Sequence, residues 1–212
     1  MSFSITYDVN NTEVSSYSIS EYLDAWSAEF GDVNHTVGNV TENNTGGFYG
    51  GTTTSGTQYA ITSTNNDYSA LIAEGDLTYT LFNDPAHTLY GTLDSVSLGD
   101  GLQGGGSTGT EYYLDAPQVS FDGLDITSDI SEGQSGAVHQ IVYGLMSGDV
   151  TPLNDALSSI FDNLDASSAF DASFAALDGD SDGTITEAEI TAYADAVTTT
   201  GVADTSAELL AA

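Results

Sequence analysis

The chain has 212 residues, of which 32 are acidic and none is lysine, arginine or cysteine, and its formal net charge at pH 7 is −32. With histidine as its only cationic side chain, it has no means of holding a nucleic-acid backbone or an anionic membrane surface, and it has no apolar run of membrane-spanning length. We therefore expect no nucleic-acid partner, no membrane insertion, no disulfide and no thiolate metal site, although 40% hydrophobic residues suffice for a core.

The N-terminal part of the chain predicts a strand, a helix and a long loop. Residues 3–8 alternate apolar and polar side chains, as a half-buried strand does. Ser18 and Glu21 fit a capping box at the start of a helix, and Gly31 is a suitable C-terminal stop. Between them, apolar residues recur at helical spacing: Ile19, Tyr22, Leu23, Trp26 and Phe30. Residues 31–56 are rich in Gly, Asn and Thr and predict a loop system of a length that is usually functional.

The middle of the chain predicts a meander of strands, and helices follow it. Strands rich in Thr, Tyr, Val and Leu are expected at 57–63, 68–73, 77–82, 88–97 and 111–121, with a flexible loop at 99–110. Helical spacing then returns over 136–147 and 151–164. Strands followed by helices predict an α+β fold, a single antiparallel twisted sheet with helices packed on one face.

Two strings carry a family resemblance: GDVNHTVGNVT (31–41) and LTYTLFNDPAHTLYG (77–91). Together with GGFYGG (46–51), QYAI (58–61) and VHQIVYGLMSGD (138–149), they resemble the secreted bacterial heme-acquisition proteins, the hemophores. The resemblance covers residues 3–165 almost without interruption, and also the last eight residues. It implies the same α+β fold, with heme held between two loops at one edge.

The resemblance implies that ferric heme b is bound through His35 and Tyr79, because imidazole nitrogen and phenolate oxygen are both axial ligands of ferric heme. An unperturbed tyrosine has a pKa of about 10 and stays protonated at neutral pH. The ferric iron must therefore supply most of the stabilisation that lets Tyr79 ionise. His87 is expected to accept a hydrogen bond from the phenol of Tyr79. The resemblance also suggests a set of pocket residues: Val40, Tyr59, Leu81, Phe82, Leu89, Tyr143 and Met146.

Ordinary roles remain open for some of these residues. An ordinary core position is an equal alternative for Phe82, and a lone loop histidine or strand tyrosine is more often structural than a ligand. His139, one helical turn before Tyr143, is interpreted as structural, and a contact with the heme pocket is the alternative.

The string DGDSDGTITEAE (178–189) departs from the hemophore pattern and fits a twelve-residue EF-hand loop at every position. The predicted Ca²⁺ ligands are Asp178, Asp180, Asp182, the carbonyl of Thr184, Thr186 through water, and Glu189. Residues 170–177 and 188–197 are expected to be the two flanking helices. The alternative is an acidic surface loop without a metal.

These features predict a secreted, extracellular heme-binding protein that is not an enzyme. By resemblance, it captures ferric heme from donor hemoproteins such as hemoglobin and delivers it to an outer-membrane hemophore receptor of a Gram-negative bacterium. One alternative is a secreted calcium-binding structural or adhesive protein. Another is a heme enzyme such as a peroxidase, which two filled axial positions disfavour because peroxide needs an open one.

Three segments are expected from the motifs. Residues 1–165 form the heme-binding domain, 166–198 the EF-hand-like extension, and 199–212 a C-terminal secretion signal. The N-terminus, MSFSITYDVN, lacks the features of a cleavable signal peptide. The ending AELLAA resembles the C-terminal signal of proteins that leave the cell through an ABC exporter, by type I secretion.

Overall fold

A computed structural model describes residues 2–31, 45–63, 68–105 and 109–209, with side chains as far as Thr199. These residues form one seven-stranded antiparallel sheet in the order β2-β3-β4-β5-β6-β1-β7. The strands are β1 (Ser4–Tyr7), β2 (Gly46–Tyr49), β3 (Ser55–Thr62), β4 (Ser69–Thr80), β5 (Thr88–Gln103), β6 (Tyr113–Ser128) and β7 (Thr184–Thr186). The helices are α1 (Thr12–Ser16), α2 (Ile19–Phe30), η2 (Ile130–Ser135), α3 (Ala137–Met146), α4 (Thr151–Asn163), η3 (Ser167–Ala169), α5 (Phe174–Leu177) and α6 (Glu187–Leu209).

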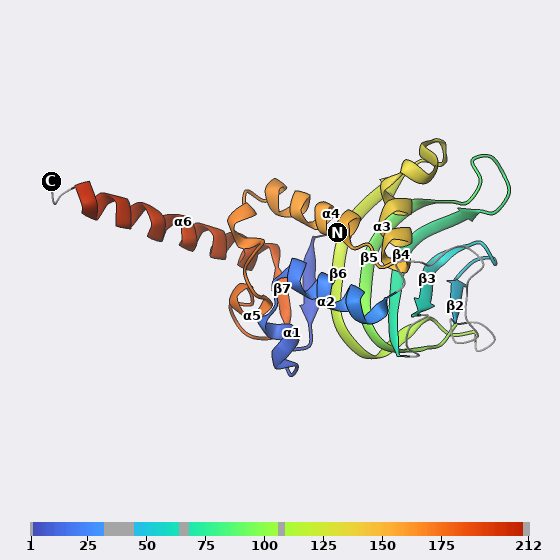
Figure 1. Ribbon diagram of the computed structural model, residues 1–212, viewed down its shortest axis with the longest axis horizontal. Coiled ribbons are helices and arrows are strands. Elements are labelled where there is room, and N and C mark those ends of the chain that lie inside the picture. The colour runs from blue at the N-terminus through green and yellow to red at the C-terminus, as the bar shows by residue number, and fades with distance from the viewer. Residues whose placement is uncertain (1, 32–44, 64–67, 106–108, 210–212) are drawn as a thin grey trace.

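The α+β fold with one antiparallel sheet is confirmed. Strands β3 to β6 follow one another in the sheet as they do in the chain, which is the predicted meander, whereas β2 forms within residues 31–56, where a loop was predicted. Helices α2, α3 and α4 lie in front of the sheet in Figure 1, and their apolar residues share one buried cluster with the strands. Helix α2 begins where the capping box predicts, because the Ser18 side chain accepts from the Glu21 backbone and the Glu21 carboxylate accepts from the Ser18 backbone.

The central strands are longer than predicted. Two strands were expected at 68–73 and 77–82, but β4 runs unbroken through both. Between the two predicted strands, Gly75 has φ +147° and lets β5 approach closely, since a Cβ there would lie 2.1 Å from the carbonyl oxygen of Thr92. The predicted loop at 99–110 is likewise wrong at its start, where β5 continues to Gln103.

A bulge in β5 determines which residues reach the helices. Ser95 pairs with Glu74 and Leu93 with Gly75, so Asp94 is an extra residue in β5. The shift keeps Leu93 before the bulge and Val96 after it in the same buried cluster under the helices. Alternation along β5 from Leu93 also places Leu89 on the helix-covered face, opposite Tyr79 of β4.

The C-terminal region completes the sheet. Strand β7 pairs with β1, with Ile185 opposite Ile5, and both side chains are fully buried. The first predicted flanking helix is shorter than expected, because only α5 forms there, whereas α6 extends well past the second and projects away from the rest of the molecule (Figure 1). Within the described part of the chain, no helix has both the length and the apolar character that a bilayer crossing requires.

Candidate functional site

The hairpin between β4 and β5 brings two predicted site residues together. Tyr79 is the penultimate residue of β4, and His87 directly precedes β5. The hydroxyl of Tyr79 lies 2.9 Å from Nδ1 of His87. When the phenol donates in this pair, which is the role predicted for His87, Nδ1 is the acceptor and the imidazole proton sits on Nε2. The structure therefore contains the tyrosine–histidine contact that the sequence predicts.

The hairpin holds His87 in a conformation that few residues adopt. Its φ is +55°, in the left-handed region, which costs a non-glycine residue about 1 kcal/mol. Thr80 stabilises the hairpin from within, because its Oγ1 donates to the Pro85 carbonyl (2.5 Å) and accepts from the Thr88 backbone (3.0 Å). From η2, the side-chain amide of Gln134 donates to the His87 carbonyl at 3.3 Å. Sequence reasoning missed Thr80 and Gln134, since no local pattern marks either one.

The surroundings of Tyr79 favour a neutral phenol in the absence of a metal. Burial raises the pKa of Tyr79, and the nearby Tyr143 phenol of α3 raises it further. Among the described residues, no carboxylate contributes to this shift in the pKa of Tyr79. A Lewis-acidic cation bound to the phenol oxygen would lower the pKa of Tyr79 and favour the phenolate, because a bound cation is often the largest local charge in a site. The phenol is therefore suited to bind a trivalent metal and unsuited to ionise alone.

Large apolar side chains are exposed around this pair. Phe82 is 85% exposed, Leu81 46% and Tyr143 39%. The ring of Phe82 also meets the His87 imidazole edge to face, with centroids 5.8 Å apart. This exposure contradicts the alternative of an ordinary core position for Phe82. Apolar side chains gathered at a hairpin tip are typical of a surface that covers a ligand.

The exposed side chains of Leu81, Phe82 and Tyr143 form an apolar rim, and the remaining described pocket residues lie behind it. Leu89 is buried on the helix-covered face. Tyr59 of β3 is partly buried, and its hydroxyl donates to the sulfur of Met146 at 3.5 Å. Burial raises the pKa of Tyr59, and the charge of Tyr79 adds to the shift, which places the two phenols near each other. His35 and Val40 lie outside the described residues, so their roles stay predictions.

The acidic loop at 178–189 brings three carboxylates close together. Carboxylate oxygens of Asp178, Asp180 and Asp182 lie within 4.8 Å of one another. Asp182 raises the pKa of Asp180 by charge repulsion, as expected where carboxylates converge. Glu189 closes the loop, because its carboxylate accepts from Gly179 N at 3.0 Å and Thr186 N at 2.9 Å. Hydrogen bonding from Thr186 is the main reason that the pKa of Glu189 lies below its usual value.

The same loop is attached to the main sheet. Asp178 is buried, which raises the pKa of its carboxyl, but four hydrogen bonds outweigh burial and hold the pKa below its usual value. One of them comes from the Tyr7 hydroxyl of β1, at 2.9 Å. Burial and this contact with Asp178 raise the pKa of Tyr7 to about 12. Thr184 and Thr186 lie in β7 and therefore pair directly with β1.

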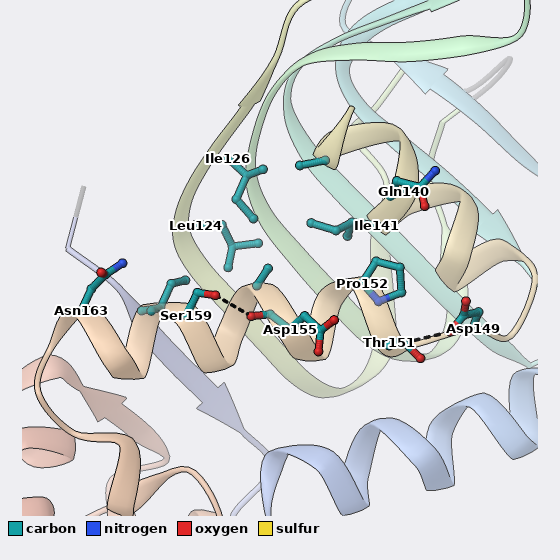
Figure 2. A pocket seen from close by; sticks show the side chains of 13 residues that line it. Leu124, Ile126, Gln140, Ile141, Asp149, Thr151, Pro152, Asp155, Ser159 and Asn163 are labelled. Atoms are coloured by element: carbon teal, nitrogen blue, oxygen red, sulfur yellow. Dashed lines mark hydrogen bonds between the residues drawn. The ribbon is translucent and has the colours of Figure 1, made fainter. Parts of the chain in front are cut away.

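A separate hollow lies between β6, α3 and α4, as Figure 2 shows. Its cavity volume is about 690 Å³. Leu124, Ile126 and Ile141 line its apolar part, and Asp149 and Asp155 line it on the polar side. None of the predicted heme or calcium residues borders it, so the candidate site is the surface around Tyr79 rather than this hollow.

Comparison of the sequence with known proteins places this chain among the heme-binding hemophores. The sequence model described as Heme-binding protein A (HasA) matches residues 1–212. Hemophore HasA from Serratia marcescens is 55% identical over 173 residues, which are 81% of this chain and 89% of that protein. The chain therefore belongs to the heme-binding protein A (HasA) family.

Solved structures of the same family share the fold. The holo hemophore HasA from Yersinia pestis is 30% identical, with a TM-score of 0.65 over 82% of this chain and 94% of that one. The apo hemophore in its hexagonal form, also from Yersinia pestis, is 32% identical, with a TM-score of 0.64 over 75% of this chain and 89% of that one.

Proposed function

We propose that this protein is a hemophore, a secreted protein that binds heme outside the cell for iron acquisition. The observation that carries the proposal is the hydrogen-bonded Tyr79–His87 pair, surrounded by exposed apolar side chains, in a chain of the HasA family. A phenol next to an imidazole that can accept its proton is suited to bind ferric iron as a phenolate, and the apolar rim is suited to a porphyrin face.

In this proposal each residue has a defined role. Tyr79 and His35 are the axial ligands of one ferric heme b, and His87 orients the Tyr79 ring through its hydrogen bond. The porphyrin is covered by the predicted pocket set, Val40, Tyr59, Leu81, Phe82, Leu89, Tyr143 and Met146. The chain has no lysine or arginine to pair with the propionates, which therefore point to solvent or to hydroxyl and backbone donors.

The protein acts as a carrier rather than as a catalyst. Two protein ligands occupy both axial positions, so no position is open for peroxide or dioxygen. The heme comes from donor hemoproteins such as hemoglobin and passes to an outer-membrane hemophore receptor. Capture from a donor requires a high affinity for ferric heme, to which an anionic phenolate ligand contributes.

Heme titration tests this function. Apoprotein titrated with hemin should give a Soret band that saturates at one heme per chain, and the fluorescence of the single tryptophan, Trp26, should fall in parallel. Tyr79→Phe should weaken binding more than His35→Ala, because it removes the anionic ligand. Tyr90→Phe is the matched control: Tyr90 follows Leu89 in β5 and points to the opposite face of the sheet. Wild-type affinity in both site variants would contradict the ligand assignment.

Calcium is the second ligand in the proposal. The six predicted ligand positions, Asp178, Asp180, Asp182, Thr184, Thr186 and Glu189, would hold one Ca²⁺ in the loop. Three of the carboxylates already converge, and their mutual repulsion favours a divalent cation. EF-hand loops usually pair with a second loop, and here the pairing of β7 with β1 takes that place. Calcium would therefore stabilise the edge of the sheet as well as the loop.

The chain divides by function into three segments. Residues 1–165 carry the heme site, 166–198 the calcium loop and 199–212 the signal for the ABC exporter. The last assignment is supported by the ending AELLAA, which resembles the C-terminal signal of proteins that leave through an ABC exporter.

A further inference from the structure

His139 fills a gap where the central sheet ends. The pairing of β5 with β6 ends at Gly91, opposite Ser128. Leu89 lies two residues beyond this end, and its backbone N–H donates instead to Nδ1 of His139, at 3.2 Å. His139 belongs to α3 and is only 7% exposed. Its imidazole thus replaces a strand as the hydrogen-bond partner of the residue opposite Tyr79.

The same imidazole supports Tyr143. The two rings are stacked, with centroids 5.4 Å apart and planes inclined by 10°. Tyr143 is 39% exposed and close enough to Tyr79 to raise the pKa of its phenol. His139 therefore contacts both the strand that faces Tyr79 and the aromatic side chain beside it, without reaching the solvent-facing rim itself.

We propose that His139 is a positioning residue for heme binding and that it acts only while its imidazole is neutral. The neutral ring accepts from Leu89 and backs Tyr143, whereas an imidazolium has no acceptor for Leu89. Proton uptake would therefore loosen this side of the pocket and release heme in acid. The inference rests on the proposed heme site and adds a proton-sensitive group to it.

The environment of His139 favours the neutral ring. Burial lowers the pKa of His139 below its ordinary value of 6.5. The titratable group that faces it is Tyr143 of its own helix, with Tyr79 of β4 beyond Tyr143. The neighbouring η2, β6 and α4 carry Glu132, Asp125 and Asp155, and within the described residues burial is the resolved cause of the shift in the pKa of His139, whose ring accepts from the Leu89 N–H.

The direction of the pH effect follows from this lowered pKa. The unfolded chain binds the proton on His139 more readily than the folded protein does. The contribution of neutral His139 to the free energy of unfolding is therefore fully present above the pKa that His139 has in the unfolded chain. It is lost as the pH falls through the folded pKa. Apoprotein and heme complex should both loosen in acid, and the heme complex reports the change directly.

Two variants separate the acceptor from the ring. His139→Asn places an amide oxygen near the position of Nδ1 but takes up no proton, and His139→Phe keeps a ring against Tyr143 but has no acceptor. Soret absorbance is followed as the pH of the heme-loaded protein is lowered. We expect His139→Asn to retain heme to a pH about one unit lower than wild type, and His139→Phe to lose heme at a higher pH than wild type. Identical midpoints in all three proteins would overturn the inference.

A measurement on wild-type apoprotein does not depend on heme or on the folding of a variant. Long-range ¹H–¹⁵N NMR identifies the tautomer of each of the three histidines. His139 should carry its proton on Nε2 at neutral pH and titrate below an ordinary histidine, and a proton on Nδ1 would overturn the inference. Wild-type protein that binds no heme at alkaline pH would instead contradict the proposed function.

Discussion

Tyr79 and His87 are eight residues apart in the chain and meet because β4 turns into β5 between them. Local spacing and one turn decide such a contact, so the sequence could predict it. Gln134 and His139 approach the same hairpin from more than forty residues away, and although helical spacing places His139 near Tyr143, no local pattern predicts either contact with the hairpin. Their contacts depend on where η2 and α3 pack, which is tertiary information.

The bond between His87 and Tyr79 should tune the affinity for heme without being essential for it. His87→Ala removes the acceptor and should weaken heme binding by roughly 10- to 100-fold, the usual cost of losing a group that orients a metal ligand. His87→Asn should stay close to wild type, because asparagine offers an oxygen near Nδ1 and tolerates the left-handed backbone that has φ +55° here. Isothermal or spectroscopic hemin titration measures both variants. Equal losses for Ala and Asn would assign the effect to packing instead of the hydrogen bond.

Elements were predictable where their signals are local. The capping box and apolar stripe of α2 lie within the helix itself, and the structure confirms both. The break predicted between 73 and 77 is wrong because the role of Gly75 depends on the neighbouring strand, where the Thr92 carbonyl leaves no room for a Cβ. The pairing of β7 with β1 joins residues about 180 positions apart, and no sequence pattern specifies that register.

Calcium should stabilise the protein through the element that contains β7. Calcium at about 100 times its Kd would add about 2.7 kcal/mol to the free energy of unfolding, if only the folded state binds it. For a chain of this size that gain corresponds to a rise in Tm of about 5 to 10 °C. Differential scanning calorimetry in calcium and in chelator measures the shift. The transition should stay single, because Phe174, Ile185 and Ile190 belong to the main core.

Glu189→Gln should abolish the calcium-dependent shift while leaving the heme spectrum unchanged. Asp195→Asn is the matched control, since it removes the same charge from an exposed position on α6. The difference between calcium and chelator is compared within each variant, because Glu189 also accepts hydrogen bonds from Gly179 and Thr186 without metal. Equal melting temperatures of the wild type in calcium and in chelator would leave the loop as an acidic surface segment.

The whole molecule combines a formal charge of −32 with a large apolar core and a smaller second apolar cluster. Stability therefore comes from apolar burial and hydrogen bonds, while charge repulsion opposes compaction. Repulsion among the carboxylates also favours an extended chain when calcium is scarce, as in the cytosol. External calcium would then favour the folded form, which suits export as an unfolded chain.

Export should depend on the C-terminal segment alone. Deleting residues 199–212 should retain the protein inside cells that carry the ABC exporter, while the purified truncated protein still binds heme with the wild-type spectrum. The pairing of β7 with β1 lies outside the deleted segment, so the fold should persist. Immunoblots of medium and cell fractions measure the distribution, and secretion of the truncated chain at the wild-type level would refute the assignment.

Resonance Raman spectroscopy of the heme-loaded protein tests the central claim, ligation by Tyr79, most directly. Excitation into a phenolate-to-iron charge-transfer band enhances the ring vibrations of the bound tyrosine, which identifies the ligand by type. The wild type and Tyr90→Phe should both show these phenolate modes, and Tyr79→Phe should lack them. Phenolate modes that persist in Tyr79→Phe, or that are missing from the wild type, would contradict the account.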